Sequence, residues 1–253
     1  MDDSFFFYWF MIVMIIIAVL IFISLLKIPA GYGQHLSKKW GPTINNDKLG
    51  WIIMELPTII LYAIFYIVGD YQTKFMTYLF SGLWFMHYVY RTFIFPSLMR
   101  GKRQIPVSII LMGLIFNSAN AYLQGRWISA LSGGYETSWL LTPMFIIGII
   151  IFFTGFVMHI HSDHIIRNLR KPGETDFKIP YGGMFRFISC PSYLGEITEW
   201  YGWAVMTWSF PGLAFAIWTT ANLGPRARSN HHWYQKTFED YPKNRKALIP
   251  FIY

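Results

Sequence analysis

The chain has 253 residues, of which 54% are hydrophobic, 20% are aromatic and only 13% are charged. This composition is too apolar for a water-soluble domain of that length and predicts an integral membrane protein. The formal net charge of +8 is typical of basic cytoplasmic loops, and nucleic-acid binding is the weaker interpretation. The single cysteine, Cys190, excludes an internal disulfide framework and a multi-thiolate metal site.

The first apolar run, 5–26, follows two aspartates instead of basic residues, and no small-residue cleavage site closes it. We therefore expect a retained membrane span. The second run, 51–68, contains Glu55. A carboxylate at membrane depth costs about 3 kcal/mol unless it is paired, so Glu55 is a candidate functional residue.

The third run, 75–99, carries His87, Tyr88 and Arg91 within about one helical turn. Further runs at 105–123 and 138–160 fit one crossing each. The last apolar region, 187–223, is too long for one crossing, and we expect Pro211-Gly212 to divide it into two helices.

Basic residues test this count. Lys and Arg number four in 27–49, one in 69–74, three in 99–104, one in 124–137, five in 161–186, none in 209–212 and six from 224 onward. Rich and poor loops alternate, and the rich loops are expected in the cytoplasm. The sequence thus predicts an all-α polytopic membrane protein of seven transmembrane helices in a single domain, 1–253, with the N-terminus outside and the C-terminus in the cytoplasm.

The end of the fifth run mixes histidine, aspartate and arginine. If its helix continues, Asp163, Arg167 and Arg170 share one stripe and could hold a ribose and a phosphate. The alternative is a positively flanked helix end. A metal site is disfavoured, because membrane di-iron enzymes use about eight histidines in several boxes, whereas this chain has seven in all.

In the sixth span, Ser192, Glu196 and Glu199 lie on one helical face, with Tyr193 beside them. Buried acids need partners, and the basic tail offers Arg226, Arg228 and His231. The group could bracket a nucleotide or form an internal charge network. No GxGxxG motif follows a predicted strand, so a Rossmann domain is not expected.

Six ordered blocks carry a family resemblance: WIIMELP, HYVYRTF, NSANAYLQGR, HSDHIIRNLRKPGE, LGEITEW and FEDYPKNRKALIPF. They resemble the steroid 5-alpha-reductase family, the 3-oxo-5-alpha-steroid 4-dehydrogenases, over residues 50–253. The resemblance implies a seven-helix membrane enzyme that uses NADPH to reduce the Δ4 double bond of a 3-oxo steroid by hydride transfer to C5. It assigns Glu55 and Tyr88 to the steroid 3-carbonyl. The positions that it assigns to the cofactor, together with Arg167 of the helical stripe, are Trp51, Arg91, Asp163, Arg167, Arg170, Ser192, Glu196, Arg226, His231 and Tyr234.

Four positions depart from residues common in the family: Met54, His159, Phe177 and Ser192. Each changes a polar contact, so another lipid enone is an alternative substrate. Two other functions stay open, an isoprenylcysteine-type membrane methyltransferase and a lipid transporter or receptor. The first gives Glu55 and Tyr88 no evident role, and the paired repeats common in transporters are not seen.

The expected partners are a steroid or other lipid enone and the lipid bilayer. No nucleic acid and no obligatory protein partner is expected. Short loops and the lack of a retention signal favour a bacterial homologue in an inner membrane over a protein of the endoplasmic reticulum membrane.

Overall fold

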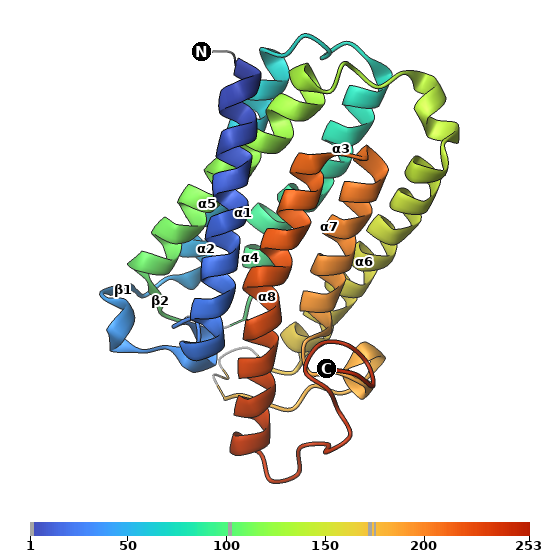
Figure 1. Ribbon diagram of the computed structural model, residues 1–253. Helices are drawn as coiled ribbons and strands as arrows, with labels where there is room; N and C mark the ends of the chain where they lie inside the picture. The colour runs from blue at the N-terminus through green and yellow to red at the C-terminus, as the bar shows by residue number, and fades with distance from the viewer. Residues whose placement is uncertain (1–2, 101–102, 172–173, 175) are drawn as a thin grey trace. The chain divides into compact units, whose positions relative to one another are not determined.

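The computed structural model describes residues 3–100, 103–171, 174 and 176–253 (Figure 1). Pro172 and Gly173 of the KPGE motif lie outside the described residues. Across these residues the regular structure is helical apart from one short antiparallel pair, β1 (Thr43–Ile44) and β2 (Ile105–Pro106), and an isolated bridge between Ile188 and Lys246. The prediction of an all-α fold is confirmed.

Each predicted apolar run forms helix. The helices are α1 (Asp3–Lys27), α2 (Asp47–Ile67), α3 (Phe75–Val89), α4 (Phe95–Leu98), α5 (Val107–Arg126), α6 (Pro143–Asn168), α7 (Pro191–Thr207) and α8 (Phe210–Thr237). Two π-helical turns, η3 (Tyr90–Ile94) and η4 (Trp127–Leu131), join α3 to α4 and extend α5. Short 3-10 helices are η1 (Gly33–His35), η2 (Lys38–Trp40), η5 (Thr137–Leu141) and η6 (Gly183–Arg186).

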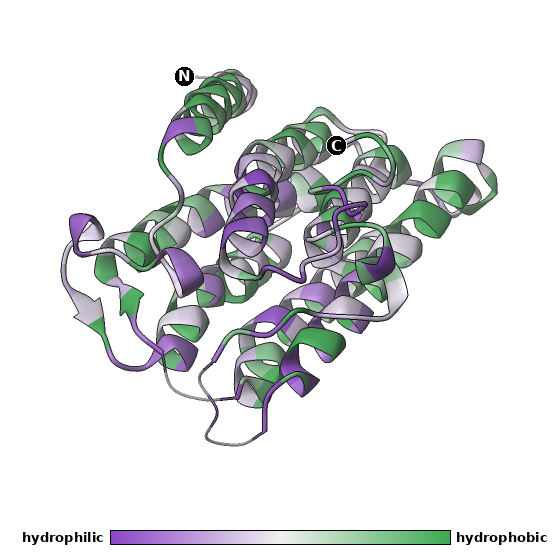
Figure 2. Ribbon diagram, turned by 90° about the horizontal axis from the view of Figure 1, so that it is seen from below, coloured by the Kyte–Doolittle hydropathy of each residue, from purple (hydrophilic) through white to green (hydrophobic). Residues whose placement is uncertain are grey.

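Among the described residues, four helical segments are long and apolar enough to cross a membrane: α1, α2, α5 continued to Leu131, and α6. Of these, α1 has the highest hydropathy, and it is green along most of its length beside the N label in Figure 2. These helices support a multi-pass membrane protein. Seven crossings, the two terminus orientations and a single domain stay predictions.

The last apolar region divides slightly earlier than predicted. Trp208, with a φ of 43°, ends α7 in the left-handed conformation, and Ser209 precedes α8. The Ser209 hydroxyl accepts a hydrogen bond from the amide of Gly212 at 3.1 Å. Pro211 therefore lies in the first turn of α8, where its missing N–H costs no helical hydrogen bond, and it starts a helix instead of separating two.

The described residues form two compact units, one of Met1–Trp9 with Gly31–Thr142 and one of Phe10–Ala30 with Pro143–Tyr253. In the first unit, α2 packs along α5. Gly125 of α5 faces the Phe65 side chain, and Gly113 faces the side chain of Met54. Near one end of α5, Arg126 forms an ion pair with Asp3.

In the second unit, α6, α7 and α8 lie side by side (Figure 1). Two glycines on α6, Gly148 and Gly155, and two on α7, Gly195 and Gly202, each repeat after seven residues. An added Cβ atom at any of the four would overlap backbone atoms of the facing helix, for example the amide nitrogen of His159 at 2.6 Å from Gly195. Small residues at this spacing therefore allow the two helical backbones to touch.

Candidate functional site

Glu55 is buried in α2, two residues before a proline inside the helix. Pro57 has no N–H for the carbonyl one turn earlier, and side chains donate hydrogen bonds to the next two carbonyls. The amide of Asn117 donates to Met54 O at 2.7 Å, and the hydroxyl of Thr58 donates to Glu55 O at 2.5 Å. The sequence WIIMELP thus combines a buried carboxylate with a backbone that needs polar neighbours.

A row of buried amides on α5 connects Glu55 to Tyr88. Asn117 Nδ2 donates to Glu55 Oε2 at 3.1 Å. Asn120, one turn further, donates from Nδ2 to the Tyr88 hydroxyl at 3.4 Å. Gln124 then donates from Nε2 to Asn120 Oδ1 at 3.3 Å. The acid and the phenol, from α2 and α3, therefore bind consecutive turns of one helix.

The Tyr88 ring is fixed by aromatic neighbours on α3. Its centroid lies 4.5 Å from Trp84 and 4.9 Å from His87, and all three side chains are buried. Trp84 in turn donates from Nε1 to Thr58 O at 3.0 Å, which anchors α3 to α2 next to Pro57. The position of the phenol is thus set by packing as well as by its hydrogen bond.

Trp51 and Arg91, both assigned to the cofactor by the resemblance, contact one another. The Arg91 guanidinium lies 4.8 Å above the Trp51 ring and 4.9 Å from that of Phe95, and it belongs to the π-helical turn η3. Among the described residues, the buried Trp51 Nε1 has no hydrogen-bond partner. The Trp51–Arg91 cation–π pair therefore offers a flat indole ring and one unused donor, Trp51 Nε1.

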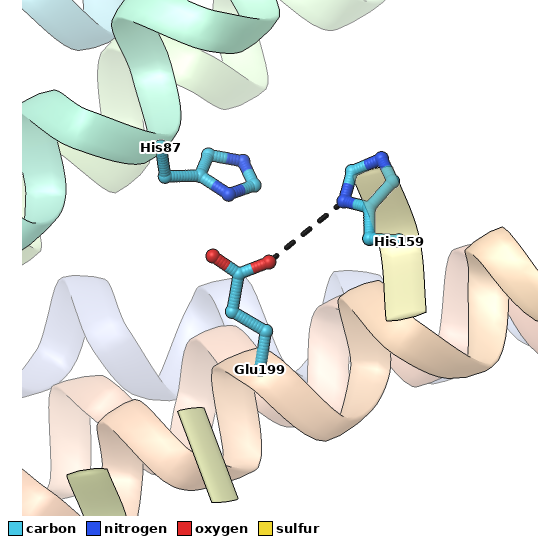
Figure 3. A group of neighbouring side chains, drawn as sticks. All are labelled: His87, His159 and Glu199. Carbon is cyan, nitrogen blue, oxygen red and sulfur yellow. Dashed lines mark ion pairs between the residues drawn. The ribbon is translucent and has the colours of Figure 1, made fainter. Parts of the chain in front are cut away.

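In the second unit, Asp163 and Glu196 surround the buried ring of His159. His159 Nε2 lies 3.2 Å from Asp163 Oδ2 and 4.0 Å from Glu196 Oε2. His159 Nδ1 lies 3.8 Å from Glu199 Oε2, the ion pair drawn in Figure 3. Two predicted cofactor residues, one from α6 and one from α7, are therefore brought together by a histidine that the sequence marked only as a departure from the family.

Arg167 and Arg170 contact different partners. The Arg167 guanidinium lies 2.7 Å from Nδ1 of His164. Arg170 donates from Nε to Asp176 O at 2.7 Å and lies 5.1 Å from the Phe177 ring. The helix continues past residue 160 as expected but ends at Asn168. The expected stripe therefore holds for Asp163 and Arg167 and is wrong for Arg170, which follows the helix.

The start of α7 and the second half of α8 contribute the other predicted cofactor residues. Ser192 is buried in the first turn of α7. The neighbouring Tyr193 receives a hydrogen bond of 3.2 Å from Arg226 Nη2, and the guanidinium lies 5.2 Å from its ring. Arg226 of α8 is thereby held against α7, with its charge at the junction of the two helices.

Ser189 joins the C-terminal tail to α8. Its hydroxyl lies 2.6 Å from His231 Nδ1 and 2.7 Å from the Tyr241 hydroxyl. Tyr241 stacks on Tyr234 with a centroid distance of 5.2 Å. Burial raises the pKa of Tyr241 and of Tyr234 and lowers the pKa of His231. At neutral pH this end of the unit presents neutral rings, so its positive charge comes from arginines.

Arg245 was quoted within a motif but given no role from the sequence. It is buried, 5.0 Å from the Tyr181 ring and 5.2 Å from that of Tyr241. Within the described part of the chain, its Nε and Nη1 have no hydrogen-bond partner. A buried cation with two unused donors suits an anionic ligand such as the phosphate of a dinucleotide, so the residues present fit such a cofactor.

Other residues that sequence reasoning missed had visible signals. Asn117, Asn120 and Gln124 are amides at positions i, i+3 and i+7 of an apolar run, which places them on one helical face. The seven-residue glycine spacing of α6 and α7 was also visible.

Comparison with known proteins agrees with the resemblance. Residues 103–253 match the sequence profile of the family described as 3-oxo-5-alpha-steroid 4-dehydrogenase. Steroid 5-alpha-reductase DET2 of Gossypium hirsutum is 43% identical over 241 residues, which cover 93% of each chain. DET2 of Arabidopsis thaliana is 40% identical over 237 residues, or 90% of each chain. The 3-oxo-5-alpha-steroid 4-dehydrogenase 1 of Mus musculus is 38% identical over 237 residues, or 93% of this chain and 92% of its own. The family prediction is confirmed, and the chain belongs to the 3-oxo-5-alpha-steroid 4-dehydrogenases, the steroid 5-alpha-reductase family of oxidoreductases.

Proposed function

We propose that this enzyme reduces the Δ4 double bond of 3-oxo-Δ4 steroids to 5-alpha-3-oxo steroids with NADPH. The observation that carries the proposal is the row of amides that holds the buried Glu55 and Tyr88 on consecutive turns of α5. The names of the relatives, steroid 5-alpha-reductase and 3-oxo-5-alpha-steroid 4-dehydrogenase, support the same reaction.

Conjugate reduction of an enone builds negative charge on the carbonyl oxygen, so its site needs hydrogen-bond donors that are already in place. Tyr88 accepts from Asn120, and its own hydrogen is therefore not used in that bond. Tyr88 donates this hydrogen to the steroid 3-carbonyl. Glu55, held at Oε2 by Asn117, donates as a protonated acid to the same oxygen or orients the phenol.

NADPH, when bound, supplies the hydride for C5. The second unit supports a dinucleotide through its chemistry. Arg170, Arg226 and the buried Arg245 are cations suited to phosphates, and Asp163 and Glu196 are acceptors suited to ribose hydroxyls. The full proposed set keeps the residues assigned from the sequence and adds one: Trp51, Arg91, Asp163, Arg167, Arg170, Ser192, Glu196, Arg226, His231, Tyr234 and Arg245.

The reaction would take place in a multi-pass membrane protein with seven crossings, an outer N-terminus and a cytoplasmic C-terminus. The alternation of basic loops supports this topology. We place it in a bacterial inner membrane because the sequence has short loops and lacks a retention signal. Since steroids partition into lipid, a substrate site within the helices would be supplied from the bilayer itself.

Product analysis tests the proposal. Purified protein in detergent or lipid is incubated with NADPH and a panel of enones that includes 3-oxo-Δ4 steroids, and the products are identified by mass spectrometry and by comparison with 5-alpha standards. We expect 5-alpha-3-oxo steroids with stoichiometric loss of NADPH absorbance. Reduction of other lipid enones but of no steroid would replace the substrate class. Methyl transfer from S-adenosylmethionine, without NADPH oxidation, would overturn the function.

A further inference from the structure

One histidine in the second unit faces three carboxylates. His159 lies between Asp163 on its own helix and Glu196 and Glu199 on α7, at distances of 3.2, 4.0 and 3.8 Å from ring nitrogen to carboxylate oxygen. The side chains of His159 and Glu199 are 2% and 0% exposed, while those of Asp163 and Glu196 are 11% and 20% exposed. The buried ring therefore links a fully buried acid to two acids nearer the surface.

The geometry indicates which form the ring adopts. A neutral imidazole has one donor nitrogen and one acceptor nitrogen, whereas an imidazolium donates from both. Here Nδ1 faces Glu199 and Nε2 faces Asp163 and Glu196, so the acceptor nitrogen of a neutral ring would face a carboxylate oxygen. An imidazolium avoids that repulsion, and it supplies a cation to three acids, one of them fully buried, that would otherwise repel each other.

The contact between the helical backbones fixes this arrangement. Gly195 faces the amide nitrogen of His159, with 2.6 Å to an added Cβ atom, and Gly155 faces the amide nitrogen of Glu199. Because the glycines let the two backbones touch at these residues, close packing fixes the distance between the Cα atoms that carry the ring and those that carry the acids of α7. His159 is thus built into the junction of α6 and α7.

We propose that His159 is a positioning residue for the cofactor site, whose charged ring holds the carboxylates of Asp163 and Glu196 in the orientation that NADPH requires. The role rests on the proposed function, because those two acids are its assigned ribose acceptors. His159 acts through them and need not touch the cofactor.

Two neutral variants separate positioning from charge. In His159→Asn the amide nitrogen takes the place of Nδ1 and keeps a donor towards Glu199. In His159→Gln it takes the place of Nε2 and keeps a donor towards Asp163 and Glu196. Both remove the cation. We expect His159→Asn to raise the Kd for NADPH, measured by fluorescence titration of the purified protein, about tenfold above that of His159→Gln, the size of one hydrogen bond to a charged group.

Thermal stability gives a second readout. Both variants should lower the unfolding midpoint by similar amounts, since both remove the cation that faces the three acids. Adding Glu199→Gln to His159→Gln removes the acidic charge that faced Nδ1 and should raise the midpoint again, whereas Glu199→Gln alone should not. Equal NADPH affinity in the Asn and Gln variants, or wild-type affinity in both, would overturn the positioning role.

A measurement on the wild-type protein avoids any failure of the variants to fold. ¹⁵N NMR of histidine-labelled protein at neutral pH should show one ring with both nitrogens protonated. This signal is assigned to His159 by its absence from the spectrum of either variant that folds. If neither variant folds, it is assigned by its protection from exchange with solvent. A His159 ring with one unprotonated nitrogen would refute the proposal even if NADPH binds. Failure of the wild-type protein to bind NADPH would instead refute the proposed function, and this role with it.

Discussion

The α2–α5 pair of the first unit and the α6–α7 pair of the second both pack through glycine, but against different atoms. Gly113 and Gly125 of α5 face the side chains of Met54 and Phe65, whereas Gly155 of α6 faces backbone atoms of α7. A side chain can change rotamer when a neighbour grows, and a backbone inside a packed helix cannot. The α6–α7 junction is therefore the less tolerant of the two.

The two helix pairs also differ in the charge of their polar groups. Neutral amides of α5 hold Glu55 and Tyr88, while charged groups meet at the α6–α7 junction. Neutral donors in an apolar setting suit a ketone, and a network of charges suits a ligand that carries phosphates. Changes at Glu55, Tyr88 and the amides that hold them should therefore alter the reaction rate, whereas changes at the α6–α7 junction should alter stability and cofactor affinity.

The largest effect is expected at the helix contact. Gly155→Ala places a Cβ atom on the backbone of α7, and we expect a loss of about 3 kcal/mol or more, seen as a poor yield of folded protein and a lower unfolding midpoint. Gly113→Ala should cost less, because the flexible Met54 side chain can move. Gly224→Ala in α8 has open space around the new methyl group and is the control. Equal costs at Gly113 and Gly155 would show that the two helix pairs tolerate an added methyl group equally well.

The next effect concerns rate. Tyr88→Phe removes the phenol donor, and Glu55→Gln replaces an acid by a much weaker hydrogen-bond donor, so each should lower the single-turnover rate of steroid reduction about 100-fold or more. The Kd for NADPH should stay within about threefold of the wild-type value, because neither side chain belongs to the proposed cofactor set. Stopped-flow absorbance of NADPH measures the first quantity and fluorescence titration the second. Near-normal turnover in both variants would remove these residues from the mechanism.

A smaller effect on rate should come from the amide row. Asn120→Ala removes the donor to the Tyr88 hydroxyl, and we expect turnover to fall about tenfold, in line with one buried hydrogen bond. Ser118→Ala is the matched control on the same helix, since the Ser118 hydroxyl bonds only to Leu114 O of α5 among the contacts seen. If both variants behave alike, the phenol is placed by its aromatic neighbours alone.

The smallest effect is expected for one arginine of α8. Arg226→Ala removes a cation held against Tyr193, and the Kd for NADPH should rise about fivefold to tenfold with kcat little changed. Arg228→Ala removes the same charge from an exposed position on the same helix and should change the Kd less than twofold. Equal changes would mean that net charge, and no specific contact, attracts the cofactor.

The sequence predicted the helices because apolar runs are long and loop charges alternate, and it predicted Glu55 because a carboxylate in such a run is costly. It did not predict the π-helical turns η3 and η4. One extra residue in a helical turn leaves the apolar run unchanged, and the helices were predicted from such runs. Asn117 and Asn120 were quoted but not assigned, because an amide in a membrane helix can bond to many partners. The role of His159 depends on its contacts with α7, and the sequence of α6 alone does not reveal which residues of another helix it faces.

The π-helical turn η3 has a consequence for comparing relatives of unequal length. Such a turn is equivalent to one residue inserted into an α-helix, and η3 contains Arg91 and directly follows the segment with Tyr88. Deleting one residue from Tyr90–Ile94 would let the segment rewind as α-helix and rotate everything beyond it by about 100°, carrying Phe95 away from Trp51. Alignments that place a gap here therefore imply a different aromatic partner for the arginine, and chimeric proteins should be spliced outside this turn.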